Sequence, residues 1–245
     1  MEYLNDLIQS TAVNGFNSVI YRLNMLLACL LALGFNYWNR KNYGISTRHY
    51  TLAMLLVFPL GYLWMLVYAW IENGFTGWGT MNIVRIFVYF PLFILPVAKY
   101  SKHRLVTILD FLSPGLALLQ AVDHISCAFS GCCHGFPAAW GIWNPVTETR
   151  LVPVQWMESL AAFVIFFILL RSGKKRNYPA DGSLYALFLI LFGSTRFLLE
   201  FLRDNEKLFW GISNLALHAA FMVLMGIGWK IYIRKEAVKT PSVTA

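Results

Sequence analysis

Charged side chains are scarce in this sequence. Asp, Glu, Lys and Arg make up 13% of its 245 residues, about half of their share in a typical soluble domain. Hydrophobic residues make up 58%, and the mean hydropathy is +0.56. These values exclude an ordinary soluble globular domain and predict a protein embedded in a lipid bilayer.

The sequence also lacks a polar segment long enough to fold as a soluble domain. About 20 apolar residues cross the hydrocarbon core of a bilayer as a helix, and about seven such runs fill most of the chain. They lie near Ser18–Trp38, Tyr50–Ile71, Met81–Ala98, Leu105–Asp123, Val152–Leu170, Ser183–Arg203 and Phe209–Ile233. The sequence therefore predicts an all-α polytopic membrane protein with about seven transmembrane helices, formed as a single integral membrane domain over residues 1–245.

Lys and Arg gather in every second connecting segment. Cytoplasmic loops carry an excess of these residues, so the basic segments predict the cytoplasmic side, which places the N-terminus outside and the C-terminus in the cytoplasm. The net charge of +8 is explained by this topology and by anionic lipid headgroups, and no nucleic-acid partner is expected. The basic segments are Arg40–Arg48, Lys99–Arg104, Arg171–Arg176 and Lys230–Lys239.

Three of the four cysteines and two of the five histidines fall in one segment, DHISCAFSGCCHG, on the expected outer side. Thiols, imidazoles and a flexible backbone meet only there, so we expect the chemistry to lie in this segment. The residues are Cys127, Cys132, Cys133, His124 and His134.

These cysteines have four interpretations. Cys127 can form a disulfide with Cys132 or Cys133, since the outer compartment is oxidising. The thiols can bind zinc together with His134 or His124, but the pattern C-x4-C-C-H fits the usual zinc spacings poorly, and no metal is expected. One thiol can act as a covalent nucleophile. The last interpretation is that all of them pack as buried thiols.

A second polar group lies in the expected sixth span. Arg196, Glu200 and Arg203 are spaced i, i+4 and i+7 and share one helix face. A charge within the hydrocarbon usually faces a partner or a watery cavity. The face is therefore interpreted either as an Arg–Glu pair that specifies a helix contact or as part of a functional site.

Other polar residues near the outer ends of the spans also have two interpretations. Arg85 lies about one turn inside the third span and is either functional or a packed residue. Gln155 and Glu158 share a face at the start of the fifth span, where they line a site or pack at the interface. Asn214 is a polar position at the start of the seventh span.

Three segments together resemble the bacterial prolipoprotein diacylglyceryl transferase family, over roughly residues 105–203 and elsewhere by topology. They are DHISCAFSGCCHG, PVQWMES and LYALFLILFGSTRFLLEFLRDNE. The family pattern Y-G-x-x-R-F-x-x-E-F-x-R is matched at Arg196, Glu200 and Arg203. Gln155 and Glu158 fall on the polar residues of H-P-x-Q-L-Y-E.

The signature G-R-I-G-N-F-x-N-G-E-x-x-G is matched only in part. Gly131 and Gly135 agree with it, but His124 stands where the family has its essential arginine. Two asparagines and a glutamate are replaced, by Cys127, Ser130 and Cys132 respectively. The His-Gly-Gly motif of the family's third span is absent from the sequence.

The resemblance implies a phospholipid-dependent transferase. In the family reaction a diacylglyceryl group moves from phosphatidylglycerol to the thiol of a prolipoprotein cysteine, and glycerol phosphate leaves. Arginine binds phosphate oxygens in a bidentate manner, and a side chain with a near-neutral pKa removes the thiol proton. The catalytic residues expected are Arg196, His124, Cys132, Cys133, His134 and Glu200; the substrate-binding residues expected are Arg203, Arg85, Gln155, Glu158, Cys127, Ser130, Gly131 and Asn214.

The expected location is the bacterial cytoplasmic (inner) membrane, with the active site facing the outer leaflet. The expected partners are an anionic phospholipid of the phosphatidylglycerol type and a prolipoprotein or another thiol-bearing acceptor, and no cofactor is expected. Two other functions stay open: a non-catalytic lipid-binding accessory membrane protein, and a Cys/His protein for thiol redox or metal handling.

Overall fold

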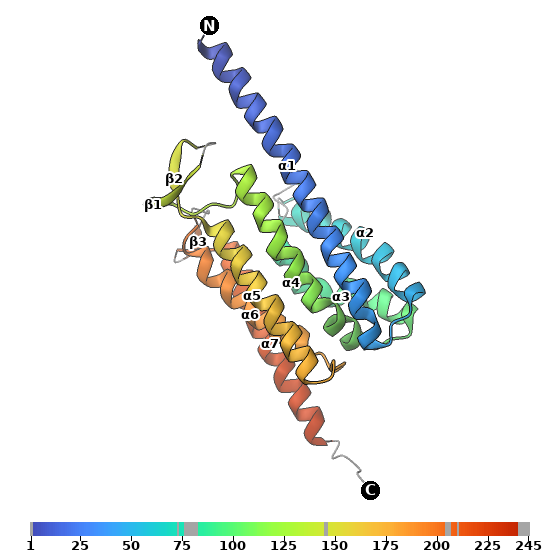
Figure 1. Ribbon diagram of the computed structural model, residues 1–245. Helices are drawn as coiled ribbons and strands as arrows, with labels where there is room; N and C mark the ends of the chain where they lie inside the picture. Colours follow the sequence, from blue (N-terminus) through green and yellow to red (C-terminus); the bar gives the residue numbers. More distant parts are fainter. Residues whose placement is uncertain are drawn as a thin grey trace.

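Long α-helices account for most of the computed structural model (Figure 1). It describes residues 2–72, 74–75, 83–144, 147–203, 207–209 and 211–239. Within these ranges the side chains of residues 2–18, 58, 65, 72, 83–85, 93, 207–209 and 236–239 are outside this description. The helices are α1 (Glu2–Asn39), the 3₁₀ turn η1 (Arg40–Tyr43), α2 (Thr47–Glu72), α3 (Ile83–Ser101), α4 (Leu105–Ser130), α5 (Val154–Lys175), α6 (Ser183–Glu200) and α7 (Asn214–Lys239).

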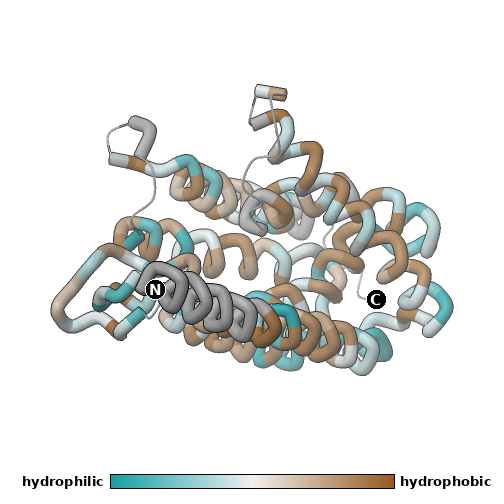
Figure 2. Tube along the Cα trace, turned by 90° about the horizontal axis from the view of Figure 1, so that it is seen from above, coloured by the Kyte–Doolittle hydropathy of each residue, from teal (hydrophilic) through white to brown (hydrophobic). Residues whose placement is uncertain are grey.

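Six of these helices are long and apolar enough to cross a membrane: α1, α2, α4, α5, α6 and α7. The third predicted span corresponds to α3, whose described apolar part, Ile86–Ser101, is shorter. Hydrophobic residues cover most of the helical turns (Figure 2), and Leu160, Leu198 and Leu224 are 65–68% exposed. Such exposure suits lipid contact and confirms a helical membrane fold.

The predicted helical membrane fold is confirmed, with two short antiparallel sheets in the connections between helices. Strand β1 (Pro137–Asn144) pairs with β2 (Thr149–Leu151), and β3 (Lys207–Phe209) pairs with β4 (Ile212–Ser213). Aromatic and β-branched side chains, such as those of Trp140, Ile142 and Trp143, favour extended backbone in β1. The segment after the cysteines is therefore an ordered hairpin outside the helical bundle (Figure 1).

Helix α4 forms the centre of the bundle and contacts α1, α3, α5 and α6. Its acidic residue Asp110 is fully buried and accepts hydrogen bonds from the backbone nitrogens of Gly182 (2.7 Å) and Tyr185 (2.9 Å). These N–H groups lie at the start of α6, where a helix has no internal acceptors for them. Asp110 therefore fixes α6 against α4 at the end of the bundle opposite the cysteine segment.

The chain after α4 is tied directly to the end of α6. Helix α4 ends at Gly131, whose φ of 71° is left-handed. Further on, the backbone nitrogen of Gly135 donates to Val152 (2.9 Å) and that of Phe136 donates to Leu202 (3.1 Å). A Cβ at Gly135 would lie 2.4 Å from the Leu202 carbonyl oxygen, so glycine permits this contact between backbones.

Helices α6 and α7 pack closely through Gly226, and we expect Gly226→Ala to destabilise the protein by about 1–3 kcal/mol through overpacking. A Cβ there would lie 2.8 Å from Ile190 Cγ1 and 2.9 Å from the Ala186 carbonyl oxygen. Gly228 on the same helix has no neighbour within 4 Å of such a Cβ and serves as the matched control. Thermal unfolding in detergent should show a lower Tm for Gly226→Ala only; equal Tm values for Gly226→Ala and Gly228→Ala would contradict close packing.

Candidate functional site

A buried carboxylate from α5, Glu158, lies at the centre of a charged network. Its Oε2 atom lies 2.6 Å from His124 Nε2 on α4 and 2.5 Å from Arg203 Nη2 beyond the end of α6. Its Oε1 atom accepts a hydrogen bond from Arg196 Nη1 on α6. One carboxylate therefore joins three cationic or potentially cationic side chains from α4, α6 and the segment after α6.

Glu200 supplies a second carboxylate to the same network. Its Oε2 lies 3.2 Å from Arg196 Nη2 and 3.9 Å from Arg203 Nε, and its Oε1 accepts a hydrogen bond of 2.8 Å from the Ser213 hydroxyl. Ser213 Oγ also accepts from the Ala216 nitrogen (3.1 Å) at the start of α7. The expected pair of Arg196 and Glu200 within α6 is present. Arg196 also contacts Glu158 of α5, and Glu200 also accepts a hydrogen bond from Ser213, which caps α7.

The five ionisable members of this network are all almost fully buried, with exposed fractions between 4% and 8%. Removing charges from water is unfavourable unless partners and hydrogen bonds replace the lost hydration. Here two guanidiniums alternate with two carboxylates, which meets that requirement. We call His124, Glu158, Arg196, Glu200 and Arg203 the charge network.

Both ring nitrogens of His124 face acceptors. Nδ1 lies 3.1 Å from the Gln120 carbonyl oxygen, and Nε2 lies 2.6 Å from the Glu158 carboxylate. A carbonyl and an ionised carboxylate only accept hydrogen bonds, so both contacts are satisfied when each nitrogen carries a proton. The geometry thus favours an imidazolium cation at the position where the family resemblance has an arginine.

The three cysteines of the loop segment converge although no disulfide joins them. The Sγ atoms of Cys127, Cys132 and Cys133 all lie within 4.8 Å of one another, and all four cysteines of the chain, each a described residue, are free. Cys127 lies in the last turn of α4, and the left-handed backbone at Gly131 (φ 71°) and Cys133 (φ 61°) turns the chain back toward it. We call these three residues the thiol cluster.

The thiol cluster is anchored to its surroundings by polar contacts. The Ser130 hydroxyl donates to Cys132 Sγ (3.0 Å), and Gln155 Nε2 donates to the Cys132 carbonyl oxygen (2.8 Å). The Arg203 guanidinium hydrogen-bonds Cys133. Hydrogen bonds from the thiols of Cys127 and Cys132, together with Arg203, hold the pKa of Cys133 well below its usual range. Arg203 therefore connects the thiol cluster to the charge network.

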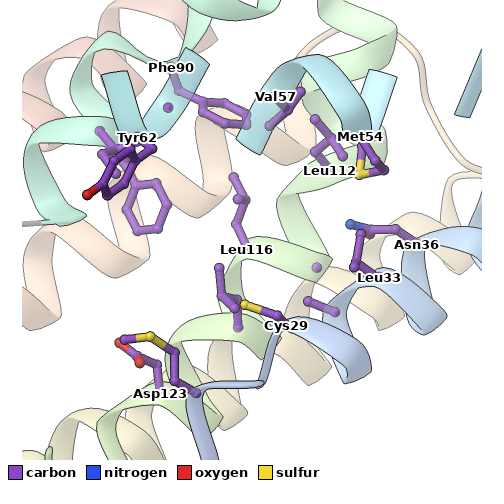
Figure 3. Close-up of a pocket in the computed structure, with 17 residues that line it drawn as sticks. Cys29, Leu33, Asn36, Met54, Val57, Tyr62, Phe90, Leu112, Leu116 and Asp123 are labelled. Atoms are coloured by element: carbon purple, nitrogen blue, oxygen red, sulfur yellow. The ribbon is translucent and has the colours of Figure 1, made fainter. Parts of the chain in front are cut away.

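A largely apolar cavity of about 250 Å³ lies between α1, α2, α3 and α4. Figure 3 shows Cys29 and Asn36 from α1, Met54 and Tyr62 from α2, and Leu116 from α4 among its lining side chains. Asp123 also lines it, immediately before His124 in the sequence. The Asp123 Oδ1 atom is buried and has no hydrogen-bond partner among the described residues.

The remaining predicted site residues are His134, Asn214 and Arg85. His134 Nδ1 lies 3.0 Å from the carbonyl oxygen of Gly135, and its side chain lines a separate small pocket beside β1. Asn214 begins α7, where its carbonyl accepts from His218 Nδ1 (2.8 Å). The Arg85 side chain falls outside the described residues.

Two residues of the site were missed from the sequence. Gln120 lies four residues before His124 and thus on the same face of α4, a spacing that could have indicated the contact. Ser213 lies three residues before Ala216, the spacing of a hydroxyl that caps a helix. Its contact with Glu200 depends on how α6 and α7 pack and has no sequence signal.

Comparisons with known proteins give one consistent family. A sequence model of the prolipoprotein diacylglyceryl transferase family matches residues 12–232. Relatives named phosphatidylglycerol–prolipoprotein diacylglyceryl transferase, from Dehalococcoides mccartyi and Clostridium tetani, are 26% identical over 147 residues and 29% identical over 144 residues.

These two alignments cover 57% and 55% of this chain. They cover 56% and 54% of the relatives, so the chain spans about half the length of these relatives. A relative of the same name from another D. mccartyi strain is 23% identical over 243 residues, which is 91% of this chain and 92% of the relative. The family match extends over nearly all of the helical bundle and includes every member of the charge network. The chain therefore belongs to the prolipoprotein diacylglyceryl transferase family.

Proposed function

We propose that this protein transfers a diacylglyceryl group from phosphatidylglycerol, or a closely similar anionic phospholipid, to the cysteine thiol of a prolipoprotein. The observation that carries the proposal is the pair of buried guanidiniums, Arg196 and Arg203, of which Arg203 also contacts Cys133 of the thiol cluster. A purely structural ion pair needs one cation for each carboxylate. With His124 as an imidazolium, this network has three cations for the two carboxylates Glu158 and Glu200.

A phosphodiester carries one negative charge, and its oxygens accept hydrogen bonds from directional donors such as guanidinium nitrogens. The Nε atoms of Arg196 and Arg203 are buried and have no hydrogen-bond partner among the described residues. Each is a directional donor that a phosphate oxygen would satisfy. We infer that the lipid phosphate binds to these donors, and that Glu158 and Glu200 hold both guanidiniums in place between turnovers.

The apolar cavity beside Asp123 supports a lipid substrate. Its 250 Å³ is lined by side chains from four helices and is largely hydrophobic. Burial of hydrocarbon in such a cavity is favourable by about 0.8 kcal/mol per methylene. We infer that part of one acyl chain lies there while the headgroup reaches the charge network.

The transfer forms one bond and breaks one. The acceptor sulfur, as a thiolate, attacks the glyceryl methylene carbon that is bonded to the phosphate oxygen. The carbon–oxygen bond breaks, and its electron pair remains on the phosphate of the departing glycerol phosphate. The thiol proton is released to solvent or to that phosphate, and the added negative charge on phosphate is stabilised by Arg196, Arg203 and His124.

The site is proposed to face the outer leaflet of the bacterial cytoplasmic membrane, with the N-terminus outside and the C-terminus inside. The basic turns η1 and 171–176 lie at the opposite end of the bundle from β1 and β2 (Figure 1). Because basic loops remain in the cytoplasm, the end that carries the thiol cluster and the charge network is the outer one.

Incubation of the purified protein with phosphatidylglycerol and a peptide that carries a lipoprotein-signal cysteine should give a peptide heavier by one diacylglyceryl group. Mass spectrometry measures the product, and glycerol phosphate should appear in equal amount. The matched control peptide has serine in place of the cysteine and should remain unmodified. An unmodified cysteine peptide, under conditions in which another family member modifies it, would rule out the proposed reaction.

A further inference from the structure

The thiol cluster is the part of the site that the proposed phosphate chemistry does not use. Its three sulfurs come from the end of α4 and from the loop that follows. Cys127 is buried, whereas Cys132 and Cys133 are exposed. The cluster is thus fixed on one side and open on the other.

The spacing of the sulfurs suits a single metal ion. Three thiolates at about 2.3 Å from a zinc ion lie about 3.8–4.0 Å from each other. The observed Sγ atoms, all within 4.8 Å of one another, reach that separation by small rotations of the side chains in the loop. Thiolates are the preferred ligands of Zn²⁺ and of softer ions.

A disulfide accounts for the cluster less well. It would join two sulfurs and leave the third unexplained. A bridge between the neighbours Cys132 and Cys133 would also join Cα atoms about 3.8 Å apart, below the roughly 4.4–6.8 Å of ordinary disulfides. Convergence of all three residues is what a metal requires.

Hydrogen bonds around the cluster resemble the outer shell of a metal site. Arg203 hydrogen-bonds Cys133, and the Ser130 hydroxyl donates to Cys132 Sγ. Donors of this kind orient coordinating sulfurs and lower their charge density. Three thiolates around a divalent ion carry one net negative charge, and Arg203 provides a positive charge in direct contact.

We propose that Cys127, Cys132 and Cys133 bind one Zn²⁺-type ion and leave its fourth coordination position open to the acceptor thiol. The metal site is inferred from the cluster alone, whereas the identity of the fourth ligand rests on the proposed function. This inference revises the expectation of no metal, which was based on the poor match of C-x4-C-C-H to common zinc spacings.

An open fourth position would solve a chemical problem of this chain. The acceptor must react as a thiolate, and both nitrogens of His124 are occupied. Three protein ligands with one open position are typical of catalytic zinc. A thiol that binds there releases its proton to solvent, and the resulting thiolate then attacks the glyceryl carbon as described above.

Metal binding is tested with the full chain in detergent, reduced and freed of reductant under anaerobic conditions. Titration with Cd²⁺ alone should produce sulfur-to-metal charge-transfer absorption that saturates at one ion per chain with an intensity of three thiolates. Zn²⁺ should displace Cd²⁺ and be recovered at one ion per chain by elemental analysis. The wild-type titration tests the site even if a variant fails to fold.

Cys132→Ser and Cys133→Ser should each lower the affinity for Cd²⁺ by at least about 100-fold, since loss of an outer-shell partner alone costs 10–100-fold. Cys29→Ser is the matched control, because Cys29 lies on α1 outside the thiol cluster, and its Cd²⁺ affinity should equal that of the wild type. The proposal would be overturned if the reduced wild type failed to bind Cd²⁺ or Zn²⁺. This holds whether its thiols stay free or re-form a disulfide. Equal loss in Cys29→Ser would also overturn the proposal.

The fourth ligand is tested without turnover. The visible absorption of the Co²⁺-loaded protein should change when the cysteine peptide is added. It should stay the same when the serine peptide is added. An unchanged spectrum with the cysteine peptide would exclude the acceptor as ligand. Metal binding without transfer to any peptide would refute the proposed function but keep the metal site. Transfer at the full rate by metal-free protein would keep the proposed function but refute a role of the metal in the transfer.

Discussion

Replacement of Arg196 by alanine should lower the rate of diacylglyceryl transfer by at least about 100-fold, the loss typical when one charge-stabilising donor is removed from an active site. Arg196 contacts both carboxylates of the charge network and has a free Nε donor among the described contacts. Arg196→Lys should restore the charge but not the planar fork that binds phosphate in two places, so most of the loss should remain. Initial rates are measured by mass spectrometry of the peptide.

Arg171→Ala is the matched control for Arg196→Ala. Arg171 is exposed on α5 at the other end of the bundle, and its replacement should leave the rate unchanged. The same variants separate an enzyme from an accessory lipid-binding protein. Two results together would contradict the transferase function and support the accessory function. Arg196→Ala would bind phosphatidylglycerol only slightly more weakly than the wild type, and the wild type would transfer the diacylglyceryl group as slowly as Arg196→Ala.

Replacement of Glu158 by glutamine should destabilise the protein by about 3–5 kcal/mol, because removal of one partner leaves buried charges uncompensated. Gln has nearly the same size as Glu, so packing changes little. His124, Arg196 and Arg203 would then share Glu200 as the remaining carboxylate of the charge network. Thermal unfolding in detergent should show a much lower Tm, and transfer activity should fall with it because both guanidiniums lose their common anchor.

Glu148→Gln provides the control for Glu158→Gln. Glu148 lies in the exposed turn between β1 and β2, and its replacement should change stability by no more than about 0.5 kcal/mol. Glu158→Asp keeps the charge and should recover part of the lost stability. A Tm for Glu158→Gln equal to that of the wild type would mean that Glu158 is not the ionised centre of the charge network.

The charged face of α6 was predictable because its partners are close in sequence. Arg196 and Glu200 differ by one helical turn, and regular helix geometry brings them together in any tertiary context. The same holds for His124 and Gln120 on α4. Arg203, by contrast, lies beyond the end of α6, and its contacts with Glu158 and Cys133 depend on the backbone connection between Gly135 and Arg203.

Glu158 shows where prediction from the sequence ended. From the sequence it was equally well interpreted as an interfacial residue of α5 or as a substrate-binding residue. Its three partners, His124, Arg196 and Arg203, are 34 to 45 residues away in the chain. No local pattern encodes such contacts, because they arise only when α4, α5 and α6 pack side by side.

The thiol cluster was ambiguous for a related reason. The spacing of Cys127, Cys132 and Cys133 crosses the end of a helix, so helical periodicity does not apply to it. The left-handed backbone at Gly131 and Cys133 brings the sulfurs together, and a non-glycine residue with positive φ is hard to anticipate. The assignment of residues 1–245 to a single membrane domain stays a prediction.

The sequence by itself determined that this protein is a helical membrane protein, which segments form its helices, and to which family it belongs. Hydrophobic length and helical spacing are local properties, and each can be read along one element. Only the tertiary structure decided that Glu158 joins the charges of α4 and α6, that Arg203 connects them to the thiols, and that three cysteines converge. Those contacts depend on the packing of distant helices and on backbone turns whose geometry the residue order does not specify.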